Sequence, residues 1–275
     1  MIRSGLLGRS ILASRSPELH EKEARAQGLE LTYELFDFTA RGWADTDLAT
    51  IMADLVAQGF SGFNVTYPFK QAVVPLLDEL DESAVAVGAV NTVAIRGGRL
   101  IGHNTDMAGF RDSLVQGLPD AGLAHVVQLG AGGAGAAVAS ALLSLGAGRL
   151  DLIDVDPARA QALATQLSVH YPEAAIRTGT PAEVDTAEAD GIVNATPIGM
   201  KDKAGLPIDP VKIQPGHWVA DIIYFPPETE LLRVARGKGC RTINGFGMVA
   251  GQAARAFQII TGHGADAGRM LESLR

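Results

Sequence analysis

The sequence predicts an α/β protein of two lobes, and three of its features carry that prediction. Strand-like and helix-like segments alternate along most of the 275 residues, which is typical of mostly parallel sheets covered by helices. A glycine-rich turn stands near the middle of the chain, between a strand-like segment and a helix-like one. The last stretch, 246–274, has apolar residues at helical spacing and little strand character. We therefore expect two lobes joined by helices, with a cleft between them.

The first lobe is expected to combine parallel strands with a small antiparallel hairpin. Pro17 can begin a helix that stops at Gly28, because proline fits the first helical turn and glycine ends helices. Apolar residues at helical spacing predict a second helix over 45–57. Gly97 and Gly98 supply the positive φ that a hairpin turn needs. The strand-like segments of this lobe are 2–8, 31–38, 62–65, 89–96 and 99–101.

The second lobe is predicted to begin near Leu123, after a turn-forming segment. The run 121–148 has no Asp, Glu, Lys or Arg and is long enough to cross a bilayer, but glycines cluster in its middle. A strand, a glycine turn and a helix explain this run better than a membrane span. We expect one lobe to comprise 1–107 with 240–275, and the other 108–239. The strands expected in the second lobe are 124–129, 149–154, 174–177, 191–194 and 218–222.

The composition is that of a folded, acidic protein. Hydrophobic residues make up 47% and charged residues 20%, which argues against a disordered chain. The 31 acidic side chains exceed the 23 basic ones, so a concentrated basic surface for nucleic acid is not expected. Cys240 is the single cysteine and is predicted to be a small buried hydrophobic residue more than a reactive thiol. With an N-terminus unlike a signal peptide, this favours a cytoplasmic protein without nucleic-acid or membrane partners.

The glycine-rich turn matches the GxGxxG pattern of dinucleotide-binding sites. Its first glycine permits the tight turn, its second lets the backbone approach a pyrophosphate, and the helix N-terminus offers N–H donors. Asp154 ends the next predicted strand, where a carboxylate accepts hydrogen bonds from the adenosine ribose. A turn that only packs helix on strand, or a site for S-adenosylmethionine, is the alternative. The turn consists of Gly130, Ala131, Gly132, Gly133, Ala134 and Gly135.

The residues around Asp154 favour NAD over NADP as the cofactor. A carboxylate at this place repels a 2′-phosphate, and the following Val155 and Asp156 provide no basic side chain. Arg159 is the one nearby residue that counts against NAD. The sequence therefore predicts a Rossmann-type lobe that binds NAD.

Three polar segments of the first lobe, 64–70, 88–92 and 102–106, lie at strand ends, where open α/β sheets bind ligands. Their short polar side chains suit a polyol. Lys70 and Asp106 could be a proton-transfer pair, although on spacing alone a solvated lysine and a helix-capping aspartate are the alternative. His103 is a weaker candidate for a general base. No pair of His or Cys residues has metal-ligand spacing, so no metal is expected.

Seven motifs in order over nearly the whole chain resemble the shikimate/quinate dehydrogenases. The resemblance is nearest to the NAD-dependent quinate/shikimate dehydrogenases, because Asp154-Val155-Asp156 stands where the NADP-dependent members carry Asn-Arg-Ser/Thr. It implies interconversion of shikimate and 3-dehydroshikimate, with quinate and 3-dehydroquinate as a second pair. The motifs are Ser14-Arg15-Ser16-Pro17, NVTYPFK from Asn64, GAVNT from Gly88, Asn104-Thr105-Asp106, GAGGAG from Gly130, NATPIGM from Asn194 and the segment from Gly245 to Gln252.

The resemblance also implies roles for individual residues. Lys70 and Asp106 would be the catalytic pair. Ser14 and Ser16 would bind the substrate carboxylate, with Tyr224 closing over it from the cofactor lobe. The residues that would bind the ring hydroxyls are Thr66, Asn91 and Gln252. Besides the glycine turn, the cofactor-binding residues would be Asp154, Val155, Arg159, Thr196, Pro197, Met200, Gly245 and Met248.

Two positions differ among the members of this family. His103 stands where many biosynthetic members have an acidic residue, although the NAD-dependent members share the Gly-His-Asn-Thr-Asp segment. Ser16 is commoner in shikimate-selective members, while some quinate-using ones carry threonine or glycine. The alternatives are an aminoshikimate dehydrogenase-type enzyme and a regulatory NAD-binding protein without catalysis. The expected partner is a small-molecule substrate, shikimate first and quinate second, in a monomer or homodimer.

Overall fold

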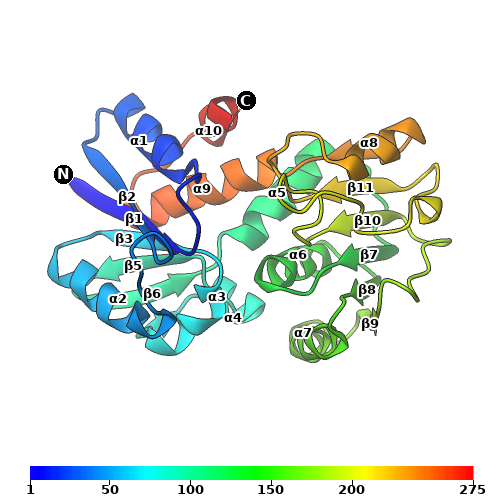
Figure 1. Cartoon of the computed structure of the whole chain (residues 1–275), viewed down its shortest axis with the longest axis horizontal. Helices are drawn as coiled ribbons and strands as arrows, with labels where there is room; N and C mark the ends of the chain where they lie inside the picture. The colour runs from blue at the N-terminus through cyan, green and yellow to red at the C-terminus, as the bar shows by residue number, and fades with distance from the viewer. Residues whose placement is uncertain (275) are drawn as a thin grey trace. The chain divides into compact units, whose positions relative to one another are not determined.

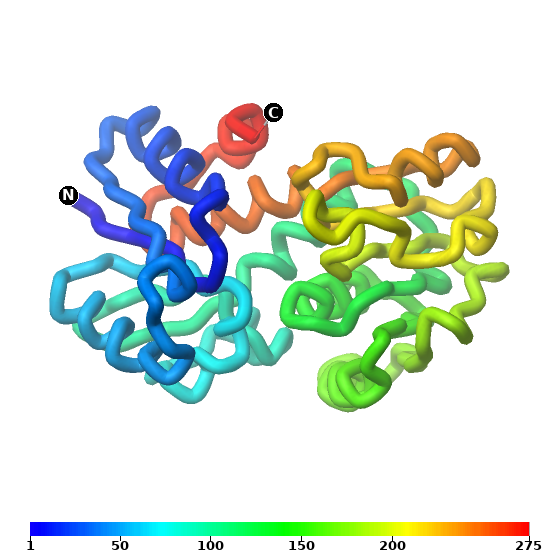
Figure 2. Tube along the Cα trace, viewed as in Figure 1, coloured from blue at the N-terminus to red at the C-terminus, as the bar shows by residue number. Residues whose placement is uncertain are grey.

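The computed structural model describes residues 1–274 and divides into two compact units. One unit runs from Met1 to Thr105 and takes in the C-terminal segment from Ala250, while the other runs from Asp106 to Val249. Each unit is built on a six-stranded sheet. The blue N-terminal strand and the red C-terminal helix belong to the same unit (Figure 1, Figure 2). The prediction of a two-lobed α/β protein is confirmed.

The first unit holds a mixed sheet with the strand order β2-β1-β3-β5-β6-β4. Most of the predicted strands are confirmed to within a few residues, and the predicted 45–57 helix splits into a 3₁₀ turn and α2. The strands are β1 (Ile2–Gly8), β2 (Leu31–Asp37), β3 (Gly62–Val65), β4 (Glu79–Leu80), β5 (Thr92–Arg96) and β6 (Arg99–His103). The helices are α1 (Ser16–Ala26), η1 (Asp45–Asp47), α2 (Leu48–Ala57), α3 (Phe69–Ala72), η2 (Val74–Leu76), α4 (Glu82–Val87) and α10 (Ala267–Leu274).

The core of the first unit anchors the polar strand ends. Phe63 on β3 and Phe69 at the start of α3 are both buried in one cluster with Phe38. The rings of Phe38 and Phe69 lie 4.4 Å apart between centroids. Aromatic side chains bury large apolar areas, so the short α3 is held by the core although four residues form only one helical turn.

The strand pairing brings several chain ends to one edge of this sheet. β1 and β3 are parallel, with Leu7 opposite Val65, so both end at the same edge. β5 is antiparallel to β3 and begins at that edge, since Thr92 faces Asn64. β6 returns antiparallel to β5 and ends at the same level, with His103 opposite Thr92. The segments that follow β1, β3 and β6 and the segment that precedes β5 are therefore neighbours.

The second unit holds a parallel sheet with the strand order β12-β11-β10-β7-β8-β9. Figure 1 shows β11, β10, β7, β8 and β9 side by side in this order. The strands are β7 (His125–Leu129), β8 (Arg149–Ile153), β9 (Ala175–Gly179), β10 (Gly191–Asn194), β11 (Trp218–Asp221) and β12 (Arg241–Ile243). The helices are α5 (Asp106–Gly117), α6 (Gly133–Ser144), α7 (Pro157–His170), η3 (Pro210–Lys212) and α8 (Glu230–Gly237), followed by the start of α9 (Phe246–Thr261), whose remainder belongs to the first unit.

The units part at different places from the boundaries that we expected at 107/108 and 239/240. The first junction lies between Thr105 and Asp106, and the second lies inside α9, between Val249 and Ala250. The second boundary moves because Arg241–Ile243 forms β12, which pairs with β11 and extends the second sheet. Three residues are too few to show strand periodicity. Among residues 1–274, no helix has both the length and the apolar character that a bilayer span requires.

Candidate active site

The two serines of the Ser14-Arg15-Ser16 segment lie side by side after β1. The Ser14 hydroxyl donates to the Ser16 hydroxyl over 3.1 Å, and the Ser16 backbone N–H donates to Ser14 Oγ over 3.2 Å. Both side chains are half-buried. The backbone N–H of Ser14 donates to the carbonyl of Ile11, which continues the loop from β1. The segment therefore presents two adjacent hydroxyls, a pattern suited to a carboxylate.

The buried Asp37 fixes the loop that carries these serines. Its carboxylate accepts backbone N–H groups of Ser10 at 3.0 Å and of Ile11 at 2.7 Å. It also accepts those of Thr39 and Ala40. Burial alone would raise the pKa of Asp37, but these backbone donors outweigh it and lower the pKa from its ordinary value. The ionised carboxylate thus holds the start of the loop in one conformation.

Thr66 and Lys70 lie on the segment that follows β3. The backbone N–H of Thr66 donates to the Leu7 carbonyl, and the Lys70 carbonyl accepts from the backbone N–H of Val90. A Cβ on Gly8 would come within 2.5 Å of the Thr66 methyl group, so glycine at that position allows the two segments to approach. Lys70 is half-buried on α3. Its backbone is thereby tied to the segment that leads to Asn91.

Asn91 stands at the centre of a buried hydrogen-bond network. Its amide Nδ2 donates to Thr105 Oγ1 over 2.9 Å, and its Oδ1 accepts from the Thr105 backbone N–H over 2.8 Å. Thr105 Oγ1 reaches Gln252 Oε1 at 3.4 Å. The structure thus brings together two residues that the resemblance assigns to the ring hydroxyls, Asn91 and Gln252.

The same network continues away from Asn91 to Asn64 and Tyr33, which were not assigned a role in the site from the sequence. Asn64 Nδ2 donates to the Asn91 carbonyl and to Thr92 Oγ1, at 3.1 and 2.9 Å. Asn64 Oδ1 accepts from the Tyr33 hydroxyl over 2.8 Å. Burial raises the pKa of Tyr33 well above its ordinary value, although a hydrogen bond with Ser16 opposes the shift. Tyr33 stays protonated and connects the serine segment to Asn91.

His103 lies beside the acidic end of α4. Its Nδ1 is 3.6 Å from Asp81 Oδ1. Asp81 caps α4 by accepting the Ser83 backbone N–H, and Ser83 Oγ in turn accepts the backbone N–H of Asn104. This arrangement supports the end of β6. Asp106 follows Thr105 directly and is a buried residue at the first position of α5, which belongs to the second unit.

The glycine turn of the second unit has the geometry of a phosphate cradle. Gly130 has φ +97°, and a Cβ there would lie 2.8 Å from the Ala195 carbonyl. A Cβ on Gly135 would lie 2.3 Å from the Gly130 carbonyl, so α6 packs closely on the turn. A Cβ on Gly132 would meet nothing within 4 Å, and Gly132 caps α6 without a side-chain acceptor. The open side at Gly132 and the N–H groups of α6 suit a pyrophosphate.

Asp154 lies against this turn. Its Oδ2 accepts the backbone N–H of Ala131 over 2.8 Å, and its Oδ1 accepts that of Asp156 over 2.9 Å. The side chain is 5% exposed. A carboxylate has about four lone-pair positions, so further acceptor capacity remains for ribose hydroxyls. The donor set of the turn and this carboxylate together fit an adenosine dinucleotide.

Val155 and Arg159 flank the Asp154 carboxylate. Val155 is an exposed apolar side chain directly after it. Arg159 Nη1 lies 3.5 Å from Asp154 Oδ1, and Arg159 Nη2 lies 3.6 Å from Asp156 Oδ2. The half-exposed guanidinium is thus shared between two carboxylates. Its charge is largely offset where a 2′-phosphate would have to bind.

Asn194 and Asp221 shape the loop after β10. Asn194 Oδ1 accepts both the backbone N–H and the hydroxyl of Thr196, at 3.0 and 2.7 Å. Its Nδ2 donates to the Ile198 carbonyl and to Asp221 Oδ1. Asp221 also accepts the Thr229 hydroxyl over 2.7 Å. Burial raises the pKa of Asp221, while these donors oppose the shift.

The remaining expected cofactor residues lie near the ends of β10, β11 and β12. The loop from Asn194 carries Thr196, Pro197 and the partly exposed Met200. Gly245 donates its N–H to the Ile223 carbonyl, and a Cβ there would lie 2.1 Å from the Ile222 carbonyl. Met248 is buried in the first turns of α9. Tyr224 follows β11 by three residues, so these positions gather at the carboxyl end of the parallel sheet.

The supporting residues Tyr33, Asn64 and Asp221 were not among the predicted site residues. Asn64 stands inside the NVTYPFK segment, which was a usable signal, but the sequence does not show that its amide turns inward. Tyr33 and Asp221 each lie on a strand whose sequence pattern predicts only a buried strand and does not mark either residue as part of a site. Their partners lie 31 and 27 residues away in the chain, and only the fold brings them together.

The chain matches known proteins over nearly its whole length. Residues 6–93 match the family model described as the shikimate dehydrogenase substrate binding domain. A shikimate dehydrogenase (NADP(+)) of Arthrobacter sp. (strain FB24) is 47% identical over 97% of this chain and 92% of the relative. A quinate/shikimate dehydrogenase (NAD(+)) of Corynebacterium efficiens is 45% identical over 97% of this chain and 95% of the relative.

A solved structure shows the same architecture. The quinate dehydrogenase from Corynebacterium glutamicum, in complex with NAD, superposes with a TM-score of 0.93. It is 44% identical, and the match covers 99% of this chain and 98% of that one. The likeness therefore extends over both units.

Proposed function

Because this chain belongs to the shikimate/quinate dehydrogenase family, it is an oxidoreductase, and we propose that it interconverts shikimate and 3-dehydroshikimate with NAD. Quinate and 3-dehydroquinate are the second substrate pair. The observation that carries the proposal is the hydrogen-bonded set of hydroxyl and amide groups at one edge of the first sheet, centred on Asn91. Such a set suits a ring acid with several hydroxyls.

The first unit would bind the substrate and the second the dinucleotide. Ser14 and Ser16 would hold the substrate carboxylate, and Tyr224 would close over it. The proposed ligands of the ring hydroxyls are Thr66, Asn91 and Gln252. The match of residues 6–93 to a substrate binding domain supports this division.

Lys70 would exchange the proton of the reacting hydroxyl, and Asp106 would orient the substrate and the lysine. In the oxidation Lys70 takes that proton, and in the reduction it returns it. NAD, when bound, supplies the hydride acceptor. The chain's own contribution is to hold the reacting groups in position, which provides much of the rate in such reactions.

NAD is the proposed cofactor in preference to NADP. Asp154 is tied to the glycine turn, and a carboxylate at that position would repel a 2′-phosphate. Arg159 is shared between Asp154 and Asp156, which weakens it as a phosphate ligand. The relatives include proteins named for each cofactor, so the local chemistry of these residues carries the choice.

Shikimate is the proposed preferred substrate. Quinate has an extra hydroxyl on the carbon that bears its carboxylate, and the Ser16 hydroxymethyl group would lie against that carbon. Glycine, which some quinate-using members carry at this position, would leave more room for the hydroxyl. The preference rests on this one side chain.

Initial rates of NAD reduction with shikimate, quinate and the amino analogue of shikimate test the function. We expect the highest kcat/KM with shikimate and a lower one with quinate. A higher kcat/KM with the amino analogue would favour an aminoshikimate dehydrogenase. Binding of NAD without its reduction by any cyclohexane polyol acid would instead favour a regulatory protein.

A further inference from the structure

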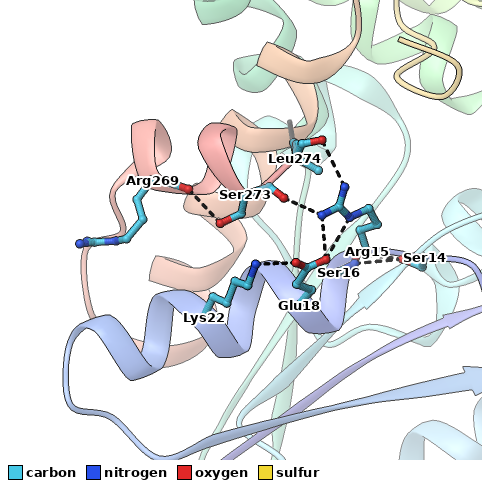
Figure 3. Close-up of polar contacts among 8 residues, drawn as sticks. All are labelled: Ser14, Arg15, Ser16, Glu18, Lys22, Arg269, Ser273 and Leu274. Carbon is cyan, nitrogen blue, oxygen red and sulfur yellow. Dashed lines mark hydrogen bonds and ion pairs between the residues drawn. The ribbon is translucent and has the colours of Figure 1, made fainter.

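The C-terminal helix α10 is joined to the serine segment by Arg15. The Arg15 side chain reaches from the start of α1 to the last residues of α10 (Figure 3). Its Nη2 donates to the Ser273 carbonyl over 2.6 Å, and its Nη1 donates to the Leu274 carbonyl over 3.2 Å. Carbonyls at a helix C-terminus have no partner within the helix and carry partial negative charge. The Arg15 guanidinium satisfies both, because it is positively charged and supplies N–H donors to these carbonyls.

The Arg15 guanidinium makes four hydrogen bonds with its five N–H donors, and none of the four goes to either serine. Its Nε and Nη2 donate to Glu18 Oε2 at 3.0 and 2.8 Å, in addition to the bonds to α10. Figure 3 shows Glu18 and the end of α10 around the guanidinium, with Ser14 and Ser16 at the base of the side chain. To bind a substrate carboxylate through two N–H groups, Arg15 would have to break at least one of these bonds. The residue between the serines therefore acts through its backbone.

α10 is fixed to α1 independently of Arg15. The Glu23 carboxylate, fully buried on α1, pairs with Arg269 Nε at 2.7 Å and Nη2 at 3.1 Å. Glu23 Oε1 also accepts the Asp266 backbone N–H over 3.0 Å at the start of α10. Met270 and Leu274 are buried along the helix. The end of α10 is thus a firm support for Arg15.

We propose that Arg15 is a positioning residue, through which the end of α10 sets the spacing of the Ser14 and Ser16 hydroxyls and so the affinity for the substrate carboxylate. The proposal rests on the proposed function, in which these serines bind that carboxylate. The two hydroxyls lie 3.1 Å apart on either side of the Arg15 backbone. A shift of that backbone moves both of them, because Arg15 is the residue that links the two serines and occupies the N-cap position of α1.

The test compares Arg15→Met, Arg15→Lys and a chain ending at Glu272, which lacks both acceptor carbonyls. In Arg15→Met and in the shortened chain, the KM for shikimate should rise about tenfold while kcat and the KM for NAD stay within about twofold. Arg15→Lys should recover part of the affinity, because an ammonium can still donate to the carbonyls. Combining Arg15→Met with the shortening should raise the KM for shikimate little further, since both changes remove the same connection between Arg15 and the end of α10.

Lys22→Met is the matched control. Lys22 pairs with the same Glu18 at 2.5 Å but does not share the bonds to α10, so its loss should leave all three constants unchanged. Thermal unfolding of each variant shows whether it folds. If Arg15 instead bound the substrate carboxylate directly, the KM for shikimate would rise in Arg15→Met but would stay unchanged in the shortened chain. This result would overturn the proposal.

Ser14→Ala separates this inference from the function on which it rests. A raised KM for shikimate in Ser14→Ala together with an unchanged KM in Arg15→Met would refute the positioning role alone. If Ser14→Ala leaves the KM unchanged, the carboxylate assignment of the proposed function fails, and the inference falls with it.

Discussion

Asp154 accepts a hydrogen bond from the backbone N–H of Ala131, over 2.8 Å, inside the glycine turn. One carboxylate thereby shapes the turn and faces the place proposed for the adenosine ribose. Asp154→Ala should raise the KM for NAD by about 10- to 100-fold, the range expected for losing hydrogen bonds to a charged group. Asp156→Ala is the control, because Asp156 caps α7 and accepts no N–H from the turn. Equal losses in both variants would contradict the assignment.

Gly132 and Gly135 should respond differently to the same added methyl group. Gly135→Ala should lower the melting temperature, because its Cβ would lie 2.3 Å from the Gly130 carbonyl. Gly132→Ala should leave the melting temperature nearly unchanged, since nothing lies within 4 Å of that Cβ, but should weaken NAD binding. Differential scanning calorimetry and NAD titration measure the two effects. Undiminished NAD affinity in Gly132→Ala would argue against a pyrophosphate at this turn.

Lys70→Ala should lower kcat by about 10²- to 10⁴-fold, which is the usual contribution of a positioned acid or base. NAD binding should persist, because Lys70 lies in the first unit and the glycine turn lies in the second. Steady-state rates and NAD titration of the same variant check this. If turnover and NAD affinity fall together to the same extent, Lys70 does not have the assigned role.

His20 should make the protein less stable in mild acid. Burial lowers the pKa of His20 to about 4, and its Nδ1 has no hydrogen-bond partner among the described residues. In the unfolded chain the histidine pKa is near 6.5, so below that pH the unfolded state binds more protons at this residue than the folded state does. The stability that comes from keeping His20 neutral is therefore complete above about pH 6.5 and is lost as the pH falls toward 4. Between pH 6.5 and 4 the free energy of unfolding should lose up to about 3 kcal/mol.

His20→Phe isolates this contribution from other acidic groups. The ring stacks on Tyr33 at 4.6 Å, and phenylalanine can keep that contact. Urea unfolding at pH 7 and pH 4.5 should show a smaller loss of stability in the variant than in the parent chain. Parallel losses in the two proteins would mean that His20 is not the buried neutral group described above.

Much of the fold could be predicted because its elements are local. The strand at Gly62–Val65 and the hairpin around Gly97 and Gly98 follow from short-range patterns, and the structure confirms them. β4 and β12 were missed because two or three residues carry no periodicity and depend on pairing with distant strands. The second junction between the units lies near residue 250 and not at the expected 239/240, because β12 extends the second sheet.

For the candidate site, the sequence indicates which kinds of residue are present but not which of them are in contact. Asp154 was expected to face a ribose, but its bond to the turn at Ala131 depends on two strands packing side by side. The path from Ser16 through Tyr33 and Asn64 to Asn91 likewise joins four separate segments. Periodicity along one segment does not report which buried amides meet across a sheet.

The ratio of kcat/KM for NAD to kcat/KM for NADP, measured with saturating shikimate, is the most direct test of the proposal that this chain is an NAD-dependent shikimate dehydrogenase. It depends at once on the activity, the substrate and the carboxylate at Asp154. We expect kcat/KM to be at least about tenfold higher for NAD, since a 2′-phosphate would meet a buried anion whose neighbouring Arg159 is already shared. A higher kcat/KM for NADP would contradict the account.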